Sequence, residues 1–479
     1  MHIEHIASNI IGGQLHPGSR LLDSHNPANG QVMGRFPQSD ASEVAAAVAA
    51  ARRAQAAWAA QSLQQRREYL HRVADAIAAN AERLATLVTL EQGRPLGGVG
   101  PDQVPGSRFE LWGCEAWTRA TASLELASEV VFEDETRRDE LHRKPYGVIA
   151  AIAPWNWPLM ISIWQVIPAI YAGNTVVLKP SEYTSVCGLE LARVIAQALP
   201  PGVLNTVSGD GSVGAMLVEH SDVNKIMFTG SGATGARIVA AAARNLTPTT
   251  MELGGNDAAI VLDDADPKAI APGLFWGAFL NMGQTCACAK RLYVPEALHD
   301  QIVAELKAII AATPMGDGLQ PGMAMGPVQN SMQLKKVAAL VDSARQEGAT
   351  IVCGGVLPEG PGNFYPLTLV TDIRDGARLV DEEQFGPVLP IIRYSTLDEA
   401  IANANRLDVG LGASVWSRDA QRAAQVATRL QAGTVWVNQH GMVHPMVPFG
   451  GNKRSGWGLE FGNEGLKGVT QPQVISLKK

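Results

Sequence analysis

The middle of the chain alternates short apolar runs with segments of helical periodicity. The runs are rich in β-branched residues and too short for typical helices, which favours buried strands. Strands are predicted at 148–153, 175–178, 225–229 and 258–262, with helices at 185–198 and 211–220. Buried strands that alternate with helices predict an α/β fold whose parallel sheet is covered on both faces. Ligands bind at the carboxyl ends of strands in such sheets, so the residues after these strands are the first candidates for chemistry.

Further helices and strands flank this region. Asp40 and Glu43 predict a capping box at the start of a helix that runs to about residue 60. A second helical pattern covers 63–92 and ends near a Gly and a Pro. Another alternating region follows, with helical patterns at 301–311 and 331–346 and a strand-like run at 389–394. The segments 123–141 and 469–477 are predicted to be two edge strands that stand apart from both regions.

Residues 145–178 carry no charged side chain, and a run of this length could cross a membrane. Prolines at 154, 158 and 168, together with Asn156, Gln165 and Asn174, interrupt the run. A helix exposed to lipid would leave the backbone groups at these positions unsatisfied. We therefore interpret the run as a buried strand, a loop, a buried helix and a second strand, and expect no membrane partner.

The composition is that of a large globular protein. A chain of 479 residues exceeds one ordinary core, so two large domains are expected. The formal net charge is −7 and no block of Lys and Arg occurs, which argues against nucleic acid as a partner. Five cysteines do not form a disulfide framework, and no signal-peptide pattern begins the chain, so a cytoplasmic location is expected.

Cys286 is the cysteine most suited to catalysis. It follows Gly283 and two polar residues, and it precedes Lys290 and Arg291. A cysteine near such cations could have a lowered pKa and act as a nucleophile. The alternative is an inert buried cysteine, which is a common environment for this residue. Cys286 and Cys288 lack partner ligands at zinc spacing, so no metal site is expected.

Three further segments offer polar groups near predicted strands. Glu252 precedes a Gly-Gly turn, where apolar surroundings would raise its pKa and suit it to general base catalysis; the alternative is a surface carboxylate. Asn156 lies between two Trp-Pro elements and could donate to an oxyanion, or it could stabilise its own turn. Residues 228–235 form a Gly-rich strand-to-helix connection suited to phosphate, but they lack the G-x-G-x-x-G spacing.

Taken in order, these segments resemble the aldehyde dehydrogenase superfamily over nearly the whole chain. Glu252 and Cys286 are 34 positions apart, the separation that the family shows. The matching motifs are Asn26-Pro27, Glu91-Gln92-Gly93-Arg94-Pro95, Pro154-Trp155-Asn156, Leu178-Lys179-Pro180-Ser181-Glu182, Phe228-Thr229-Gly230-Ser231, Glu252-Leu253-Gly254-Gly255, Gly283-Gln284-Thr285-Cys286, Glu382-Glu383-Gln384-Phe385-Gly386-Pro387 and the segment 448–456.

The resemblance implies a covalent mechanism and a nicotinamide cofactor. Cys286 would attack the aldehyde, Asn156 and the Cys286 backbone N–H would bind the oxyanion, and Glu252 would activate the hydrolytic water. NAD is the implied hydride acceptor, with NADP as the alternative. The implied cofactor-binding residues are Ile152, Trp155, Lys179, Glu182, Gly211, Thr229, Gly230, Ser231, Glu383 and Phe385. Glu182 would repel a 2′-phosphate and so favour NAD, although Lys179 would offset part of that repulsion.

The implied substrate pocket is mostly apolar. Its expected lining residues are Trp157, Ile161, Trp164, Thr285, Val443 and Phe449. This composition favours a small hydrophobic or aromatic aldehyde as the partner. Two tryptophans would also suit a quaternary ammonium, so a betaine-type amino-aldehyde is an alternative. A CoA-acylating semialdehyde dehydrogenase, or a non-enzymatic scaffold, agrees less well with a chain that retains the nucleophile, the base and the oxyanion donor.

The resemblance also implies the domain organisation. We expect a Rossmann-like coenzyme domain at 1–122 and 146–254, an α/β catalytic domain at 255–454, and a small β oligomerisation arm. The arm would comprise 123–145 and a strand in the C-terminal segment 455–479, and its unpaired edges predict a homodimer or homotetramer. Asn256 and Leu459 depart from the usual Lys and Arg. Cys288 is a bystander in this mapping; the alternatives are that it lines the pocket or forms a reversible oxidised link with Cys286.

Overall fold

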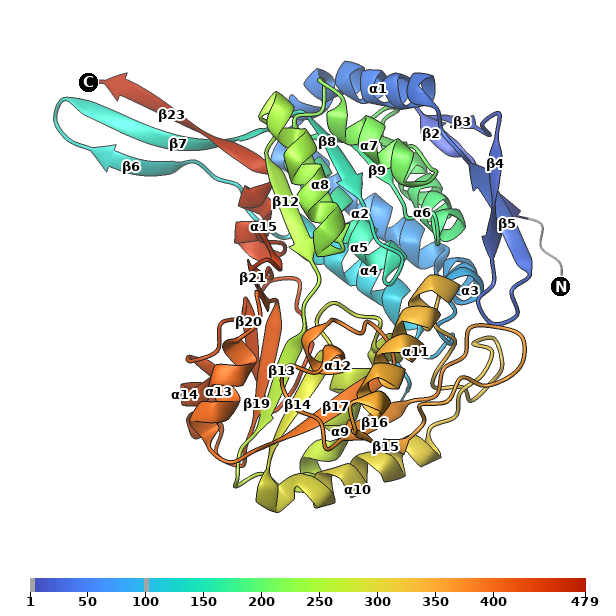
Figure 1. The fold of residues 1–479 in the computed structure, drawn as a ribbon. Coiled ribbons are helices and arrows are strands. Elements are labelled where there is room, and N and C mark those ends of the chain that lie inside the picture. The colour runs from blue at the N-terminus through green and yellow to red at the C-terminus, as the bar shows by residue number, and fades with distance from the viewer. Residues whose placement is uncertain (1–4, 99–102) are drawn as a thin grey trace.

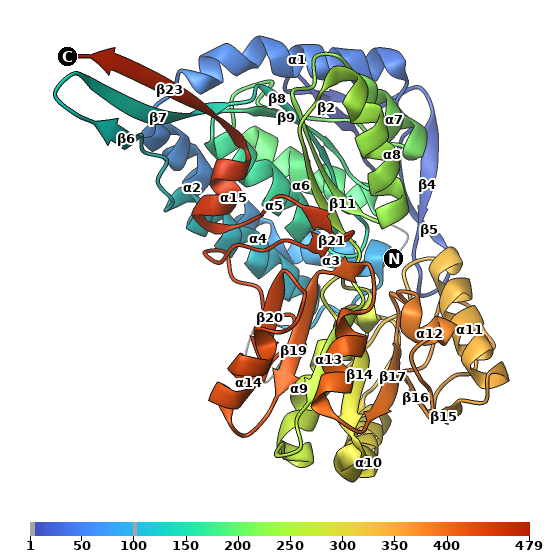
Figure 2. The same ribbon diagram turned by 60° about the vertical axis from the view of Figure 1, so that its left-hand side comes forward.

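A computed structural model describes residues 5–98 and 103–479. Two α/β bodies lie one above the other, and a narrow β arm projects from the upper body and ends near the C-terminus (Figure 1). Turning the molecule shows that the arm stands clear of both bodies (Figure 2). The α/β fold predicted from the alternating pattern is confirmed.

The upper body contains a six-stranded sheet in the order β10-β9-β8-β11-β12-β22. Five neighbouring strands are parallel, and only the short β22 is antiparallel. The strands are β8 (Val148–Ile152), β9 (Thr175–Lys179), β10 (Leu204–Thr206), β11 (Lys225–Gly230), β12 (Thr249–Leu253) and β22 (Gly456–Trp457). Strand order reverses between β8 and β11, and the carboxyl ends of strands at such a reversal form a crevice for ligands.

Side chains on β8 alternate between two hydrophobic cores. Ile149 and Ala151 pack into one core, whereas Val148 and Ala150 pack into the other. This period of two is what a fully buried strand requires. The helices that cover the sheet are α1 (Ala41–Ala59), α2 (Leu63–Ala79), α3 (Ala81–Gln92), α4 (Ser107–Ala122), α5 (Pro158–Tyr171), α6 (Ser185–Gln197), α7 (Gly211–Glu219) and α8 (Gly232–Ala242), which the short η1 (Ala243–Asn245) continues.

The apolar run at 145–178 folds inside this body as β8, α5 and β9, as predicted. In the part of the chain that the structure describes, no helix has the length and apolar character needed to cross a membrane.

The predicted N-terminal helices need one correction. The capping box is confirmed, because Asp40 accepts from the Glu43 N–H and the Glu43 carboxylate accepts from the Asp40 N–H. The single helix expected at 63–92 is wrong, because Asn80 separates α2 from α3. The Asn80 amide donates to the Ala76 carbonyl, which shows the local competition with helical bonding that makes asparagine favour helix ends.

The lower body contains a seven-stranded sheet in the order β15-β16-β17-β14-β13-β19-β20. All neighbours are parallel except β15 and β16. The strands are β13 (Asp257–Val261), β14 (Ala289–Pro295), β15 (Thr350–Cys353), β16 (Thr368–Thr371), β17 (Val388–Tyr394), β19 (Gly412–Trp416) and β20 (Thr434–Val437). The helices are α9 (Pro267–Phe279), η2 (Leu280–Gly283), α10 (Glu296–Ala312), α11 (Ser331–Gln346), α12 (Arg378–Asp381), α13 (Leu397–Asn405) and α14 (Ala420–Ala427).

The placement of β13 corrects the predicted grouping of strands. The run at 258–262 was expected beside the strands at 148–153, 175–178 and 225–229, but β13 pairs with β14 and β19 in the lower sheet. The Gly254-Gly255 turn carries the chain from the carboxyl end of β12 to the amino end of β13. Hydrophobicity identifies a buried strand but carries no information on which sheet it joins.

The arm is a three-stranded antiparallel sheet in the order β23-β7-β6. Its strands are β6 (Glu129–Glu133), β7 (Arg137–Pro145) and β23 (Thr470–Lys478), so three strands form where two were expected. The short α15 (Gly462–Gly468) leads into β23. The remaining strands are β1 (His5–Ile6), β2 (Asn9–Ile11), β3 (Gln14–His16), β4 (Leu21–His25), β5 (Val32–Pro37), β18 (Val409–Gly410) and β21 (Asn452–Lys453).

Candidate active site

The upper sheet presents most of the predicted cofactor residues at one edge. Ile152 ends β8 and Trp155 follows it, while Lys179 ends β9 and Glu182 follows it. Thr229 and Gly230 end β11, Ser231 caps α8, and Glu252 lies near the end of β12. Because these strands are parallel, the topology collects segments from distant parts of the chain at the carboxyl edge.

The lower sheet meets this edge with the loops that precede its strands. Cys286 lies just before β14, and Glu383 and Phe385 lie just before β17. The two groups of residues are in contact, since the rings of Trp155 and Phe385 lie edge to face with centroids 5.4 Å apart. The candidate site therefore lies where the carboxyl edge of one sheet meets the amino edge of the other.

Hydrogen bonds hold the loop that carries Cys286. The Asn156 amide donates to the Gln284 carbonyl at 2.9 Å, and the Trp157 indole donates to the Thr285 hydroxyl at 2.9 Å. A Cβ on Gly255 would lie 3.1 Å from the Cys286 carbonyl oxygen, so the turn after Glu252 packs directly on this loop. An asparagine amide has two N–H donors, and the second is available for a substrate oxyanion.

The lowered pKa expected for Cys286 is wrong for this structure. Burial raises the pKa of the thiol to about 12, and the positive charge of Lys290 opposes that rise. The carboxylates of Glu252, Asp257 and Glu383 raise it further. The sequence shows the cation at 290, but it does not show the carboxylates that the fold brings beside the thiol.

Asn156 is positioned by a buried ion pair and its partners. Glu110 accepts from the Leu159 and Met160 N–H groups at the start of α5, and its carboxylate lies 2.9 Å from the Arg94 guanidinium. Arg94 in turn donates to the Asn156 carbonyl at 3.0 Å. Arg94, from the motif at 91–95, therefore holds the backbone of Asn156.

Glu252 has a second buried carboxyl beside it that the sequence analysis missed. Both Glu252 oxygens are buried without a hydrogen-bond partner among the described residues. Burial, followed by the charge of Glu460, raises the pKa of Glu252 well above its usual range, as predicted, and burial raises the pKa of Glu460 to about 8. Phe449 pairs with Glu460 through two backbone hydrogen bonds, which brings the C-terminal segment to the site. The only signal in the sequence was that Glu460 lies near the recognisable motif at 448–456.

This pair predicts a pH-dependent stability difference. A carboxyl whose folded-state pKa is raised costs stability above its unfolded pKa, near 4.5, because only the unfolded chain then ionises freely. Glu460→Gln should therefore become more stable relative to the wild type as the pH rises from about 5 to 8, by about 3 kcal/mol. Thermal unfolding of both proteins across this range measures the difference.

The change in this stability difference with pH excludes any pH-independent effect of the introduced glutamine on packing. Glu464→Gln, on an exposed residue, is the matched control and should show no such trend. A constant difference between Glu460→Gln and the wild type would contradict the raised pKa.

The helix starts that follow β10 and β11 are exposed. A Cβ on Gly211 or Gly232 would meet nothing within 4 Å, so the starts of α7 and α8 are open. The Thr229 hydroxyl accepts from Gln165 at 3.0 Å, and the backbone N–H groups at the start of α8 suit a pyrophosphate. Lys179 lies 4.0 Å from Glu182 and beside the first turn of α7. A Cβ at Gly254 would lie 2.2 Å from a Glu383 oxygen, which shows how closely the turn approaches that carboxylate.

An aromatic cluster adjoins the two glutamates. The Trp164 ring lies 5.8 Å from Trp117 and 4.7 Å from Phe461, and Phe449 stacks on Phe461 at 6.0 Å. Trp117, Trp164 and Phe461 line a small hollow whose other lining residues include no charged side chain. Trp117 and Phe461 were not predicted, because no local pattern links them to the helical face of Trp164.

The other predicted pocket residues occupy different environments. Ile161 is almost fully buried, and Val443 is half-buried against the same core. The Trp157 ring is covered by the Arg94 guanidinium at 3.8 Å from its centroid. Trp157 therefore cannot offer that face to a cationic substrate.

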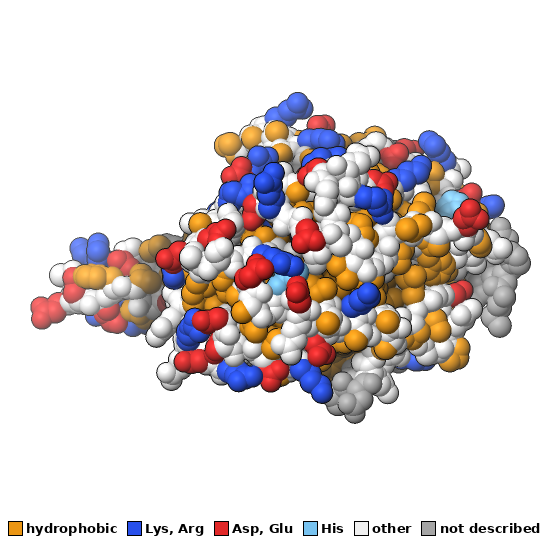
Figure 3. Space-filling model, turned by 60° about the horizontal axis from the view of Figure 1, so that its bottom comes forward, with side chains coloured by type: hydrophobic (Ala, Val, Ile, Leu, Met, Phe, Trp, Pro, Cys, Tyr) orange, Lys and Arg blue, Asp and Glu red, His pale blue; other side chains and the backbone are white. Residues whose placement is uncertain are grey.

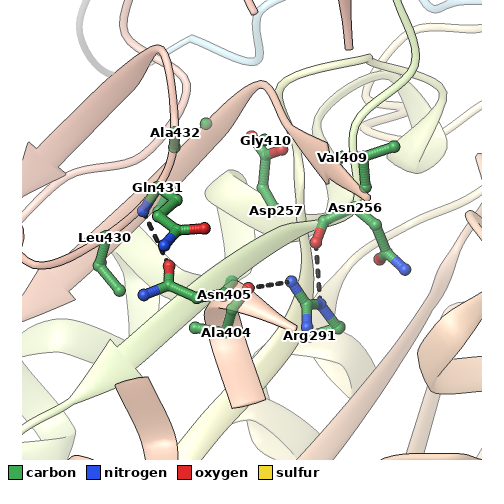
Figure 4. Close-up of a pocket in the computed structure, with 13 residues that line it drawn as sticks. Asn256, Asp257, Arg291, Ala404, Asn405, Val409, Gly410, Leu430, Gln431 and Ala432 are labelled. Atoms are coloured by element: carbon green, nitrogen blue, oxygen red, sulfur yellow. Dashed lines mark hydrogen bonds between the residues drawn. The ribbon is translucent and has the colours of Figure 1, made fainter. Parts of the chain in front are cut away.

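Cys288 and Asn256 take structural positions. Cys288 is buried and directs its Sγ toward the Leu280 carbonyl at 3.8 Å, and all five cysteines are unpaired. Asn256 borders a small hollow, in which Arg291 donates to the carbonyls of Asn256 and Ala404 (Figure 4). None of Cys286, Glu252 and Asn156 lines this hollow, so it is separate from the candidate site.

Among the described residues no group of His, Cys, Asp or Glu is arranged as metal ligands would be.

The fold and the site define an oxidoreductase in which a cysteine and a carboxylate pair meet a dinucleotide-binding edge. The aldehyde dehydrogenase family model matches residues 15–475. The chain is 39% identical over 452 residues to betaine aldehyde dehydrogenase of Cereibacter sphaeroides. The aligned region covers 94% of this chain and 92% of that enzyme. It is 38% identical over 475 residues to phenylacetaldehyde dehydrogenase of Pseudomonas fluorescens, with coverages of 97% and 95%.

Solved structures agree with these matches. An NAD⁺ complex of aldehyde dehydrogenase from Bacillus cereus superposes with a TM-score of 0.94 at 32% identity, covering 98% and 96% of the two chains. An NADP-dependent enzyme from Escherichia coli has a TM-score of 0.95 at 33% identity, with coverages of 99% and 98%. Lactaldehyde dehydrogenase from Escherichia coli has a TM-score of 0.95 at 32% identity and full coverage of both chains, 100% and 100%. The chain belongs to the aldehyde dehydrogenase family and is an NAD(P)-dependent aldehyde dehydrogenase.

Proposed function

We propose that this enzyme oxidises hydrophobic, preferably aromatic, aldehydes to carboxylic acids with NAD. The Cys286 thiolate adds to the aldehyde carbon, and the Asn156 amide stabilises the oxyanion of the resulting thiohemiacetal. Bound NAD supplies the acceptor for the hydride that leaves this carbon. Glu252 then takes a proton from the water that attacks the thioester, which releases the acid and restores the thiol.

The aromatic cluster is the observation that carries the substrate class. Trp117, Trp164, Phe449 and Phe461 supply ring edges and faces beside the Glu252–Glu460 pair, and ring–ring contacts favour aromatic ligands. The Arg94 guanidinium over Trp157 disfavours the quaternary ammonium of a betaine-type substrate. The relatives do not decide between aromatic and betaine-type substrates, because the chain has similar sequence identity to a phenylacetaldehyde dehydrogenase and to a betaine aldehyde dehydrogenase.

The proposed domain roles follow from the same geometry. We assign residues 1–122 and 146–254 to coenzyme binding, and residues 255–454 to catalysis. Glu182 is half-exposed at the carboxyl edge, where it would accept hydrogen bonds from ribose hydroxyls and repel a 2′-phosphate. NAD is therefore the proposed cofactor. Unpaired cysteines support a reducing, cytoplasmic location.

A substrate panel tests this proposal. Phenylacetaldehyde, benzaldehyde, hexanal and betaine aldehyde are each assayed for NAD(P)H formation with NAD and with NADP, with and without CoA. We expect the highest kcat/KM for the aromatic aldehydes with NAD, without any need for CoA. Preference for betaine aldehyde would contradict the substrate class, and turnover that requires CoA would contradict hydrolysis through Glu252.

Trp164→Leu should lower kcat/KM for phenylacetaldehyde about tenfold while changing that for acetaldehyde little, because only the ring–ring contact is lost. Trp112→Ala is the matched control, since Trp112 is exposed on α4. Equal losses for both substrates would show that Trp164 acts through stability rather than through substrate contact.

The arm is proposed to pair with a second copy of the chain. It exposes Val130, Val131 and Phe132 on β6 and Val474, Ile475 and Leu477 on β23. The space-filling view shows apolar side chains interspersed with charged ones on the projecting arm (Figure 3). Apolar residues on exposed edge strands are unfavourable in water and would be buried by another subunit.

Ile475→Asp should shift the protein toward a 50.8 kDa monomer, because an unpaired charge cannot be buried in such an interface at low cost. Gln473→Asp changes a polar residue two positions away on the same strand and is the control. Light scattering coupled to size exclusion measures both masses. A wild type that is already monomeric would contradict the proposal.

A further inference from the structure

Lys290 lies beside the nucleophile but belongs to none of the roles described so far. It is the second residue of β14 and is almost fully buried. Its ammonium donates to the Cys286 carbonyl at 2.6 Å and to the Thr285 carbonyl at 3.0 Å. It also forms an ion pair with a Glu383 oxygen at 3.1 Å. These three contacts match the three N–H donors of an ammonium, so Lys290 is fully engaged with the site.

Without the Lys290 ammonium, the charges near Cys286 would be negative only. The carboxylates of Glu252, Asp257 and Glu383 all act on the thiol, and Lys290 is the cation that opposes them. Burial alone would lower the pKa of Lys290, but the charges of Glu383 and Asp257 outweigh burial and raise it. The lysine is therefore protonated at neutral pH, beside a nucleophile that must lose its proton.

The ion pair also links the two halves of the site. Glu383 accepts from the Gly255 N–H at 3.2 Å as well as from Lys290, so it bridges the turn after Glu252 and the ammonium. A Glu383 carboxylate close to Lys290 neutralises part of the positive charge that would otherwise act on Cys286.

We propose that Lys290 is a positioning residue that fixes the backbone of the nucleophile loop and supplies the positive charge that stabilises the Cys286 thiolate. Glu383 sets the strength of this effect by its ion pair with Lys290. The inference rests on the proposed role of Cys286 as nucleophile. It assigns to Lys290 no contact with the substrate or with the reacting atoms.

The test is the pH dependence of Cys286 alkylation by iodoacetamide in the protein without added cofactor. Thiolate is the reactive form, so the midpoint of the rate profile reports the thiol pKa. All variants carry Cys288→Ala, and peptide mapping by mass spectrometry assigns the label to Cys286. Thermal unfolding of each variant confirms that it is folded.

Lys290→Met preserves chain length and apolar volume but removes the charge. We expect its alkylation rate at about pH 7.5 to fall at least about tenfold and its midpoint to move to higher pH. Lys290→Arg retains the charge and should restore most of the rate. A purely structural lysine would alter unfolding without moving the midpoint, and an unchanged midpoint in folded Lys290→Met would overturn the proposal.

Glu383→Gln supplies a second test of the charge balance if Lys290→Met fails to fold. Removing this carboxylate leaves more of the Lys290 charge to act on the thiol and also removes a negative charge that acts on the thiol directly, so the midpoint should move to lower pH. A midpoint that stays or rises would overturn the proposal. The role of Cys286 is tested separately by the activity of Cys286→Ala. If Cys286→Ala loses activity but the alkylation midpoint does not move in Lys290→Met or Glu383→Gln, the inference on Lys290 is rejected and the proposed function stands.

Discussion

Cys286→Ala should lower kcat/KM for every aldehyde by at least about 10⁴-fold, because removing a nucleophile from a covalent mechanism removes the main reaction path. An aldehyde transfers hydride readily only after addition has made its carbon tetrahedral. Alanine cannot form that adduct, whereas the Asn156 amide and the cofactor edge would remain in place. Steady-state NADH formation measures the loss, and quenching of tryptophan fluorescence measures NAD affinity.

Cys286→Ala should bind NAD with an affinity within about twofold of the wild type, since the substitution removes a single sulfur atom. Cys288→Ala is the matched control, because Cys288 is buried with its Sγ turned toward Leu280. It should retain near wild-type turnover. A Cys286→Ala enzyme that still oxidises aldehydes would assign the chemistry to another group, and a dead Cys288→Ala enzyme that remains folded would require the two cysteines to act together.

Glu252→Gln should produce a burst of about one NADH per subunit, followed by turnover about 10³-fold slower than that of the wild type. Glutamine has nearly the same shape as glutamate but cannot take a proton from water. Cys286 would therefore become acylated and remain so. Stopped-flow absorbance measures the burst, and intact-protein mass spectrometry detects the trapped acyl group.

The pH dependence separates the roles of the two carboxyls. Because the pKa of Glu252 is raised, the wild-type hydrolytic step should accelerate as the pH rises through that raised pKa. Glu460→Gln should retain hydrolysis and shift this profile to lower pH, since one of two coupled charges is gone. A complete loss without any burst in Glu252→Gln would show that Glu252 is needed before acylation. An unchanged steady state would exclude it as the base.

Local patterns predicted the secondary structure well where one rule dominated. The helix at 331–346 has the predicted bounds, and the strand at 389–394 is one residue longer at its start. The capping box at Asp40 formed because both partners lie within four residues. Prediction failed at Asn80, where the apolar period continues through a break that a side-chain hydrogen bond creates.

The sequence by itself determined the α/β alternation and the buried character of the 145–178 run, and its motifs indicated the aldehyde dehydrogenase family. These depend on period, composition and motifs, which are local properties of the chain. The tertiary structure alone decided that β13 joins the lower sheet, that Glu460 lies beside Glu252, and that Arg94 covers Trp157. It also decided the charge balance at Cys286, because the burial and the carboxylates that raise the thiol pKa come from segments far apart in the chain. Desolvation and Coulomb interactions depend on distance in space, and the sequence alone does not specify that distance.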